Sequence, residues 1–178
     1  QRNSMNTSEG SFNELTDRNI SLDTAKKYGV KSVLNSDGSI NSHIYPYYIS
    51  NEMVGSKIRL TENKEFQWKG TSKGTGLFGQ NLFGTNGKFI TLTEGECDAM
   101  AAYQMLGSKW PVVSVKNGAG GGVKDVKENL EYLESFEYVV IAFDNDKVGK
   151  DNARRVARVL KPGKAKILTL PEGYKDPN

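Results

Sequence analysis

Two acidic clusters, each directly after a short apolar run, constrain this chain more than any other feature. Phe89–Thr93 is followed by Glu94-Gly95-Glu96, and Tyr138–Phe143 is followed by Asp144-Asn145-Asp146. Short runs that are rich in β-branched and aromatic residues and bounded by turn residues are typical of buried strands. In an α/β sheet the functional crevice lies beyond the carboxyl ends of the strands, and both clusters would point there.

The two clusters together favour a divalent-metal site. Carboxylates that are brought together repel one another unless a cation lies between them, and hard oxygen ligands select Mg²⁺ or Mn²⁺ over zinc or copper. Asp144 and Asp146 would face the same side if the strand continued through them. Taken alone, Asp144 also fits a solvated turn, and Glu96 fits a first-turn dipole position as well as a ligand. Because Glu94 follows an equivalent strand, we interpret the set as a metal site for phosphate chemistry.

Composition narrows the function classes only in part. The chain has 24 basic and 21 acidic residues, so its net charge of +3 does not by itself indicate nucleic-acid binding. One cysteine, Cys97, excludes an internal disulfide, and together with the single His43 it excludes a Cys/His zinc module. We expect Cys97 to be structural and His43 to be exposed. No apolar run approaches the length of a bilayer span, so we expect a soluble, cytoplasmic protein.

The first half of the chain predicts a small α+β unit. Residues 1–13 are polar and are predicted to be disordered. A short helix is expected from Leu22 to Gly29, with Ser21 or Asp23 as its N-cap. From there to about residue 70 alternating polar and apolar residues predict antiparallel strands. We place this N-terminal subdomain at 14–87, with the glycine-rich segment 71–87 as its boundary.

The second half predicts a parallel sheet. Apolar runs and helical patterns alternate in the order strand 89–93, helix 98–106, strand 112–115, helix 123–136, strand 138–143, helix 148–160 and strand 165–170. Such alternation calls for right-handed crossovers between parallel strands. The predicted fold class is therefore α/β over residues 88–178, a four-strand parallel sheet with flanking helices, preceded by the smaller antiparallel subdomain.

A glycine-rich segment, Gly118 to Gly122, lies between a predicted strand and a predicted helix. It does not match a dinucleotide fingerprint, because Val123 occupies the place of the third glycine, and the chain has no glycine-lysine-serine/threonine phosphate loop. A turn of this kind can bind an anion through backbone N–H groups. A plain flexible loop explains it equally well.

Basic residues concentrate upstream of the acidic clusters, at Lys57, Arg59, Lys64, Lys69 and Lys73. Lys57 and Arg59 share one face of a predicted strand. A solvated edge strand shows the same pattern, since lysines guard exposed edges. Beside a metal–carboxylate site, however, a basic strand has the charge needed to bind a triphosphate or a nucleic-acid backbone.

Several motifs together resemble a known family. The two acidic clusters resemble the Toprim domain of primases, topoisomerases and related nucleases. The upstream motifs narrow this to the primase part of T7-type phage primase-helicases and their Twinkle-like relatives. These motifs are Thr16–Ser21, Lys57-Ile58-Arg59 with Lys64-Glu65-Phe66, Gly76–Gly79 and the closing Lys175-Asp176-Pro177-Asn178.

The resemblance implies roles for individual residues. It implies Mg²⁺ or Mn²⁺ binding by Glu94, Asp144 and Asp146, with Asp176 as a further ligand. Lys57 and Lys64 would act with these acids in catalysis, and nucleotide or DNA would contact a basic and polar set: Lys57, Arg59, Lys64, Lys116, Asn117 and Gly118. The charge pattern described above, rather than the resemblance, adds Lys69 and Lys73 to this binding set.

The resemblance also implies an activity and its partners. The activity would be DNA-templated RNA primer synthesis from ribonucleoside triphosphates on single-stranded DNA. A helicase domain and a separate zinc-binding domain would belong to the full-length protein, since nothing in this sequence could form a zinc ribbon. Two rivals remain: a Toprim nuclease or topoisomerase fragment, and a Twinkle-like module that binds single strands without catalysis. Clustered carboxylates beside DNA argue against a pure binder.

Overall fold

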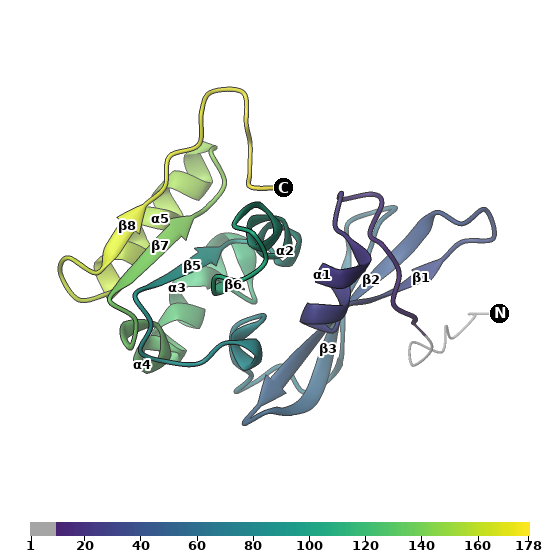
Figure 1. Ribbon diagram of the computed structural model, residues 1–178, viewed down its shortest axis with the longest axis horizontal. Helices are drawn as coiled ribbons and strands as arrows, with labels where there is room; N and C mark the ends of the chain where they lie inside the picture. The colour runs from purple at the N-terminus through teal and green to yellow at the C-terminus, as the bar shows by residue number, and fades with distance from the viewer. Residues whose placement is uncertain (1–9) are drawn as a thin grey trace.

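The computed structural model describes residues 10–178 and contains two four-stranded sheets in two lobes (Figure 1). The strands of the first sheet are antiparallel and lie in the order β1-β2-β3-β4. The strands of the second are parallel and lie in the order β6-β5-β7-β8. The predicted fold class is confirmed.

The N-terminal lobe begins with the predicted helix, α1 (Leu22–Tyr28). The Ser21 side chain accepts a hydrogen bond from the Thr24 N–H, and Gly29, at φ 71°, ends the helix. Of the two candidate caps, Ser21 is therefore the one used. The remaining elements are β1 (Lys31–Leu34), β2 (Ile40–Ile49), β3 (Glu52–Leu60), β4 (Phe66–Gly70) and a 3₁₀ turn (Gln80–Leu82).

The predicted disorder over 1–13 falls mainly on residues 1–9, which lie outside the described residues. From Gly10 onward the chain is described. Ser11 pairs with Ser32 of β1 through two backbone hydrogen bonds, of 3.1 and 2.8 Å. Residues 10–13 therefore run beside the first sheet.

The second lobe follows the predicted alternation. Its elements are β5 (Phe89–Thr93), α2 (Glu96–Met105), β6 (Val112–Ser114), α3 (Gly118–Glu128), α4 (Leu130–Glu134), β7 (Tyr138–Ala142), α5 (Lys147–Val159) and β8 (Ala165–Ile167). Thr93 of β5 is in register with Ala142 of β7, so these two neighbouring strands end side by side. The residues that follow them share one edge of the sheet.

The glycine-rich segment differs from the predicted loop, because α3 already begins at Gly118. The Asp125 carboxylate, within α3, accepts hydrogen bonds from the backbone N–H groups of Lys116 (2.9 Å) and Asn117 (2.7 Å). These bonds hold Lys116 and Asn117 against α3. The single helix expected over 123–136 is also divided in two, with a break at Asn129.

The structure has two apolar cores, of which the first joins the two lobes. One lies between α1, β2 and α2, where Tyr28, Tyr45, Phe78 and Met100 are buried. The other lies between the parallel sheet and helices α3 to α5. Helix α2 thus faces the N-terminal lobe (Figure 1). Within residues 10–178, no helix combines the length and the apolar character that crossing a membrane requires.

Candidate metal and nucleotide site

The carboxyl ends of β5 and β7 bring Glu94 and Asp144 into contact. Glu94 Oε1 accepts a hydrogen bond from the Asp144 backbone N–H at 3.1 Å, and its Oε2 lies 3.5 Å from Asn152 Nδ2 of α5. Burial is the main cause that raises the pKa of Glu94 above its ordinary value. Glu94 therefore connects the ends of two strands and the helix that follows them.

Three carboxylates converge beside this contact. Asp98, Asp144 and Asp176 each offer an oxygen, and these oxygens lie within 4.8 Å of one another. Asp98 comes from the first turn of α2, Asp144 from the end of β7, and Asp176 from the C-terminal segment. Gly95 leaves room for this arrangement, since a Cβ there would lie 3.1 Å from Asp98 Oδ2. An all-oxygen set of this kind suits a hard divalent cation.

The protonation of this cluster is strongly affected by its surroundings. Burial, followed by the nearby charges of Asp176 and Asp144, raises the pKa of Asp98 to about 7. Burial, followed by the charge of Glu94, raises the pKa of Asp144 to about 6. Asp144 Oδ1 is buried and, among the described residues, has no hydrogen-bond partner. A cation would satisfy this oxygen and relieve the mutual repulsion, so the residues fit a bound metal ion.

Asp146 has a different local role. The strand ends at Ala142, and Asp146 is the N-cap of α5, where its Oδ1 accepts a hydrogen bond from the Gly149 N–H at 2.7 Å. Its side chain is not in the group that Asp98, Asp144 and Asp176 form. β7 therefore does not continue through Asp144 and Asp146, as it would have to do for both side chains to face the same side. The predicted role of Asp146 as a metal ligand remains a prediction.

Asn145 connects the acidic edge to the C-terminal segment. Its Nδ2 donates to the carbonyl oxygens of Tyr174 (3.0 Å) and Leu170 (3.3 Å), and its N–H donates to Lys175 O. These contacts hold the segment that carries Asp176. Sequence reasoning missed this role, although an asparagine between two aspartates was a signal that could have drawn attention.

The predicted catalytic Lys57 is buried between the lobes. Its Nζ lies 2.8 Å from Glu96 Oε1 and donates to Lys116 O at 2.8 Å, while the Tyr47 hydroxyl donates to the same Glu96 oxygen. Lys57 and Glu96 are both less than 8% exposed. β3 is an inner strand of its sheet, not a solvated edge. Glu96 is thus the partner of Lys57 rather than a member of the Asp98 group.

The other predicted nucleotide-binding residues divide into two sets. Lys116 is buried, and its Nζ donates to Ser72 O (2.9 Å) and Thr75 Oγ1 (3.1 Å). Asn117 is held by Asp125, and Gly118 begins α3. By contrast, Lys64, Lys69 and Lys73 are exposed, and Arg59 is half-buried. The exposed set is free to contact a ligand that approaches β3 and β4.

His43 is fully buried, which corrects the expectation that it is exposed. Its Nε2 lies 3.0 Å from Asp17 Oδ2, and its Nδ1 lies 2.8 Å from the Tyr45 hydroxyl, which in turn lies 3.2 Å from Cys97 Sγ. Burial alone would raise the pKa of Asp17, but the hydrogen bond and charge of His43 hold it below its ordinary value. Cys97 is buried, as expected of a structural cysteine.

Comparison with known proteins shows which class of protein this chain is similar to. A family model described as Toprim-like matches residues 91–178, which include the parallel sheet and the acidic edge. The DNA helicase/primase of Enterobacteria phage T3 is 34% identical over 167 residues, which are 92% of this chain and 28% of that protein. The chain thus spans less than a third of the length of this relative.

Comparison with solved structures narrows the Toprim-like class to phage primases. The primase fragment of the bacteriophage T7 primase-helicase superposes with a TM-score of 0.82 and is 34% identical, over 94% of this chain and 68% of that one. A second match is a primase domain from a complex of T7 lagging-strand DNA polymerase with two gp4 subunits, bound to an RNA/DNA hybrid and dTTP. It superposes with a TM-score of 0.80 and is 33% identical, over 94% of this chain and 84% of that one. The chain belongs to the Toprim-containing primase domains of T7-type phage primase-helicases.

Proposed function

We propose that this chain is a primase core, which synthesises short RNA primers on a single-stranded DNA template. The observation that carries the proposal is the convergence of Asp98, Asp144 and Asp176 within 4.8 Å, beside Glu94 and at the junction with a basic N-terminal lobe. Membership of a primase family supports nucleotidyl transfer as the reaction at this acidic centre.

The acidic residues would hold Mg²⁺ or Mn²⁺. Asp98, Asp144 and Asp176 would be the main ligands, because their oxygens lie close together, and Glu94 and Asp146 lie beside them in the sequence or the fold. Such an ion would stabilise charge on the triphosphate and on the attacking 3′-oxygen during nucleotidyl transfer. The protein groups at this edge are carboxylates, which suit the binding of cations more than the transfer of protons.

The basic residues would position the anionic reactants. Lys64, Lys69 and Lys73 are exposed on the lobe that adjoins the acidic edge, so they can bind the phosphates of the nucleotide and template. Lys57 would contribute indirectly, because its bond to Glu96 fixes this lobe against α2. In the full-length protein, a helicase domain and a zinc-binding domain would supply unwinding and template selection, in the cytoplasm of the host cell.

One experiment separates this function from its rivals. The chain is incubated with single-stranded DNA, labelled ribonucleoside triphosphates and Mg²⁺ or Mn²⁺, and the products are resolved by size. Dinucleotides and longer RNA oligomers support a primase, cleaved DNA supports a nuclease, and a gel shift alone supports a non-catalytic binder. The products should disappear in Asp144→Asn and persist in Glu172→Gln, a matched change at an exposed carboxylate of the C-terminal segment.

A further inference from the structure

Positive charge is concentrated in one segment outside the site described above. Residues 147–166 contain eight Lys or Arg and a single acid, Asp151, a net charge of +7 in a chain whose total is +3. The other residues together are therefore net negative. This segment comprises α5, β8 and their connection.

The charges of α5 lie along one side of the helix. Lys147, Lys150, Arg154 and Arg158 recur at spacings of three or four residues and are exposed, and Lys161 follows just beyond the helix end. We call these five residues the α5 basic stripe. The opposite side, with Gly149, Asn152, Ala153 and Val156, is buried against the sheet. At 1.5 Å per residue, Lys147 and Arg158 are roughly 16 Å apart along the axis, enough to face several successive phosphates.

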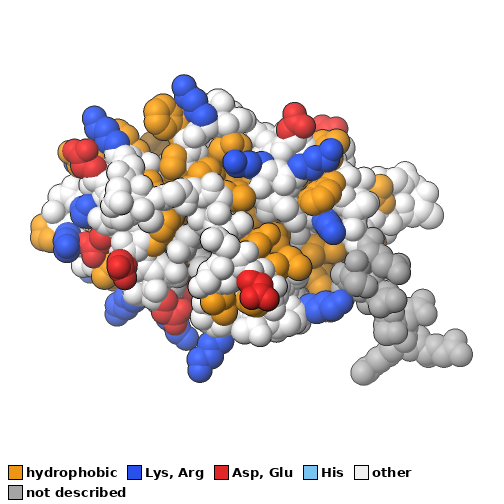
Figure 2. Space-filling model, turned by 60° about the horizontal axis from the view of Figure 1, so that its bottom comes forward, with side chains coloured by type: hydrophobic (Ala, Val, Ile, Leu, Met, Phe, Trp, Pro, Cys, Tyr) orange, Lys and Arg blue, Asp and Glu red, His pale blue; other side chains and the backbone are white. Residues whose placement is uncertain are grey.

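The stripe is only weakly neutralised within the protein. Within residues 10–178 it makes one ion pair, Arg154 with Asp151 at 3.2 Å, which is exposed, and such pairs contribute little to stability. Like charges four residues apart destabilise a helix, so Lys150, Arg154 and Arg158 repel one another. On the face drawn in Figure 2, Lys and Arg side chains stand singly, with Asp and Glu side chains among them. The stripe is thus available to an external polyanion.

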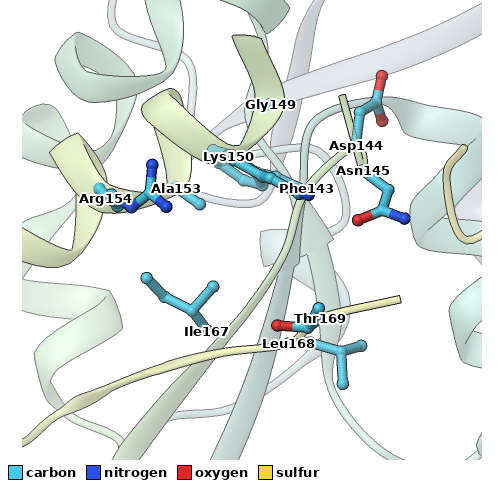
Figure 3. Close-up of a pocket in the computed structure, with 10 residues that line it drawn as sticks. All are labelled: Phe143, Asp144, Asn145, Gly149, Lys150, Ala153, Arg154, Ile167, Leu168 and Thr169. Atoms are coloured by element: carbon cyan, nitrogen blue, oxygen red, sulfur yellow. The ribbon is translucent and has the colours of Figure 1, made fainter. Parts of the chain in front are cut away.

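The stripe begins at the acidic edge. Lys147 directly follows Asp146, the N-cap of α5. Lys150 and Arg154 line a hollow of about 230 Å³ together with Asp144 and Asn145. Figure 3 shows both cations projecting from α5 into the space bordered by Ile167, Leu168 and Thr169, with Asp144 and Asn145 at one end. A chain of phosphates that passes the acidic edge would therefore meet these cations next.

We propose that the α5 basic stripe is a second nucleic-acid-binding surface, which holds the phosphate backbone of a strand running from the acidic edge along α5. A bilayer is a poorer match, because the apolar side of α5 is buried in the core and cannot insert. The proposal goes beyond the function proposed above, in which nucleotide and template contact the N-terminal lobe. It concerns binding alone.

The test measures how DNA affinity depends on salt. Binding of fluorescein-labelled oligo-dT is followed by fluorescence anisotropy over a range of NaCl concentrations, without nucleotides or divalent ions. The test variant is Lys150→Gln/Arg154→Gln/Arg158→Gln. The control, Lys26→Gln/Lys109→Gln/Lys127→Gln, removes the same charge from exposed lysines outside α5. A third variant, Lys150→Arg/Arg154→Lys/Arg158→Lys, keeps the charge of the stripe.

Losing three phosphate contacts should make the slope of log affinity against log salt less negative by about 2 and, extrapolated from about 1 M, weaken binding by roughly 50-fold at physiological salt. The control and the charge-conserving variant should behave like the wild type. The thermal unfolding temperature should change little in all three, since the substituted side chains are exposed and the charge pairs that are removed are weak. Equal slopes for the test variant and the wild type would overturn the proposal. An equal loss in the control would overturn it too. So would a test variant that binds oligo-dT like the wild type but, in a parallel sedimentation assay, loses binding to phosphatidylserine vesicles.

Discussion

Lys57 Nζ lies 2.8 Å from Glu96 Oε1, and this buried ion pair joins an inner strand of the N-terminal sheet to the first turn of α2. Tyr47 and Lys116 O complete the hydrogen bonds of the pair. A lysine that the family resemblance assigns to substrate binding thus also fixes the two lobes against each other. Its loss should affect stability as well as activity.

Lys57→Met should lower the free energy of unfolding by about 3–5 kcal/mol, because the Glu96 carboxylate would remain buried without its cation. Urea denaturation followed by circular dichroism measures the change. Lys64→Met, an exposed site, should stay within about 0.5 kcal/mol of the wild type. Equal stability of the two variants would contradict a structural role for Lys57.

Asp98→Asn, Asp144→Asn and Asp176→Asn should each weaken Mn²⁺ binding. Changes to groups that merely orient a ligand cost about 10–100-fold, so removal of a ligand charge should cost at least as much. Isothermal titration calorimetry gives the affinity, with Glu172→Gln as a control of matched chemistry. Wild-type affinity in the Asp98 variant would remove that residue from the site.

Metal stabilisation should depend on pH. The pKa values of Asp98 and Asp144 are raised from the ordinary 3.8 to about 7 and about 6. At a pH between 3.8 and these raised values, the folded chain therefore binds more protons than the unfolded chain. Without metal, their contribution to the free energy of unfolding therefore falls as pH rises from about 4 to about 7. A divalent cation must displace these protons, so the increase in Tm on adding Mn²⁺ should be small at pH 5 and larger at pH 8. An increase that is the same at both pH values would argue against binding at these carboxylates.

Asn145→Ala should loosen the C-terminal segment at the acidic edge, since the variant loses the side-chain hydrogen bonds to Leu170 O, Pro171 O and Tyr174 O and keeps only the backbone bond to Lys175 O. We expect Mn²⁺ affinity to fall by about tenfold, because Asp176 would no longer be positioned. Limited proteolysis should also cut near Tyr174 sooner than in the wild type. The Asn41→Ala variant, distant in the N-terminal lobe, serves as the control. Unchanged proteolysis would show that other contacts hold the segment.

Gly149→Ala should disturb the acidic edge directly. A Cβ at position 149 would overlap the Asp144 backbone carbonyl, which has no freedom to move away. We expect a loss of about 1–3 kcal/mol in stability together with weaker metal binding. Gly84→Ala, where nothing lies within 4 Å of the added Cβ, should be neutral. Chemical denaturation with and without Mn²⁺ compares the two.

The elements of the second lobe could be predicted because local signals define them. The apolar runs before Glu94 and Asp144 are bounded by turn residues, and the alternation with helices leaves a parallel sheet as the consistent topology. The family resemblance placed Asp144 and Asp176 in one site, and the structure brings their oxygens together. Asp98 was missed, although it follows Glu94 by four residues and lies in the first turn of a helix at the same edge.

The features that could not be predicted depend on contacts between distant segments. The burial of Lys57 requires Glu96, 39 residues away, and the burial of His43 requires Asp17 and Tyr45. A charged residue in a strand predicts solvent exposure unless its partner is known. Asp144 and Asp146 would face the same side only if the strand continued past its predicted end at Phe143, but Asp146 instead caps α5 by accepting a hydrogen bond from the Gly149 N–H.

The docking of the C-terminal segment has a consequence for how the protein folds. Asn178 Nδ2 donates to Arg18 O at 2.8 Å, a contact between residues 160 positions apart. Contacts of such long range form slowly, since a large loop must close first. We therefore expect Asn178 to reach Arg18 only after both lobes have formed, whereas Asn145 can hold the segment that carries Asp176 once the second lobe has formed. A chain whose C-terminal segment has not yet docked would offer a cation only two of the three aspartates, so tight metal binding should report on that docking.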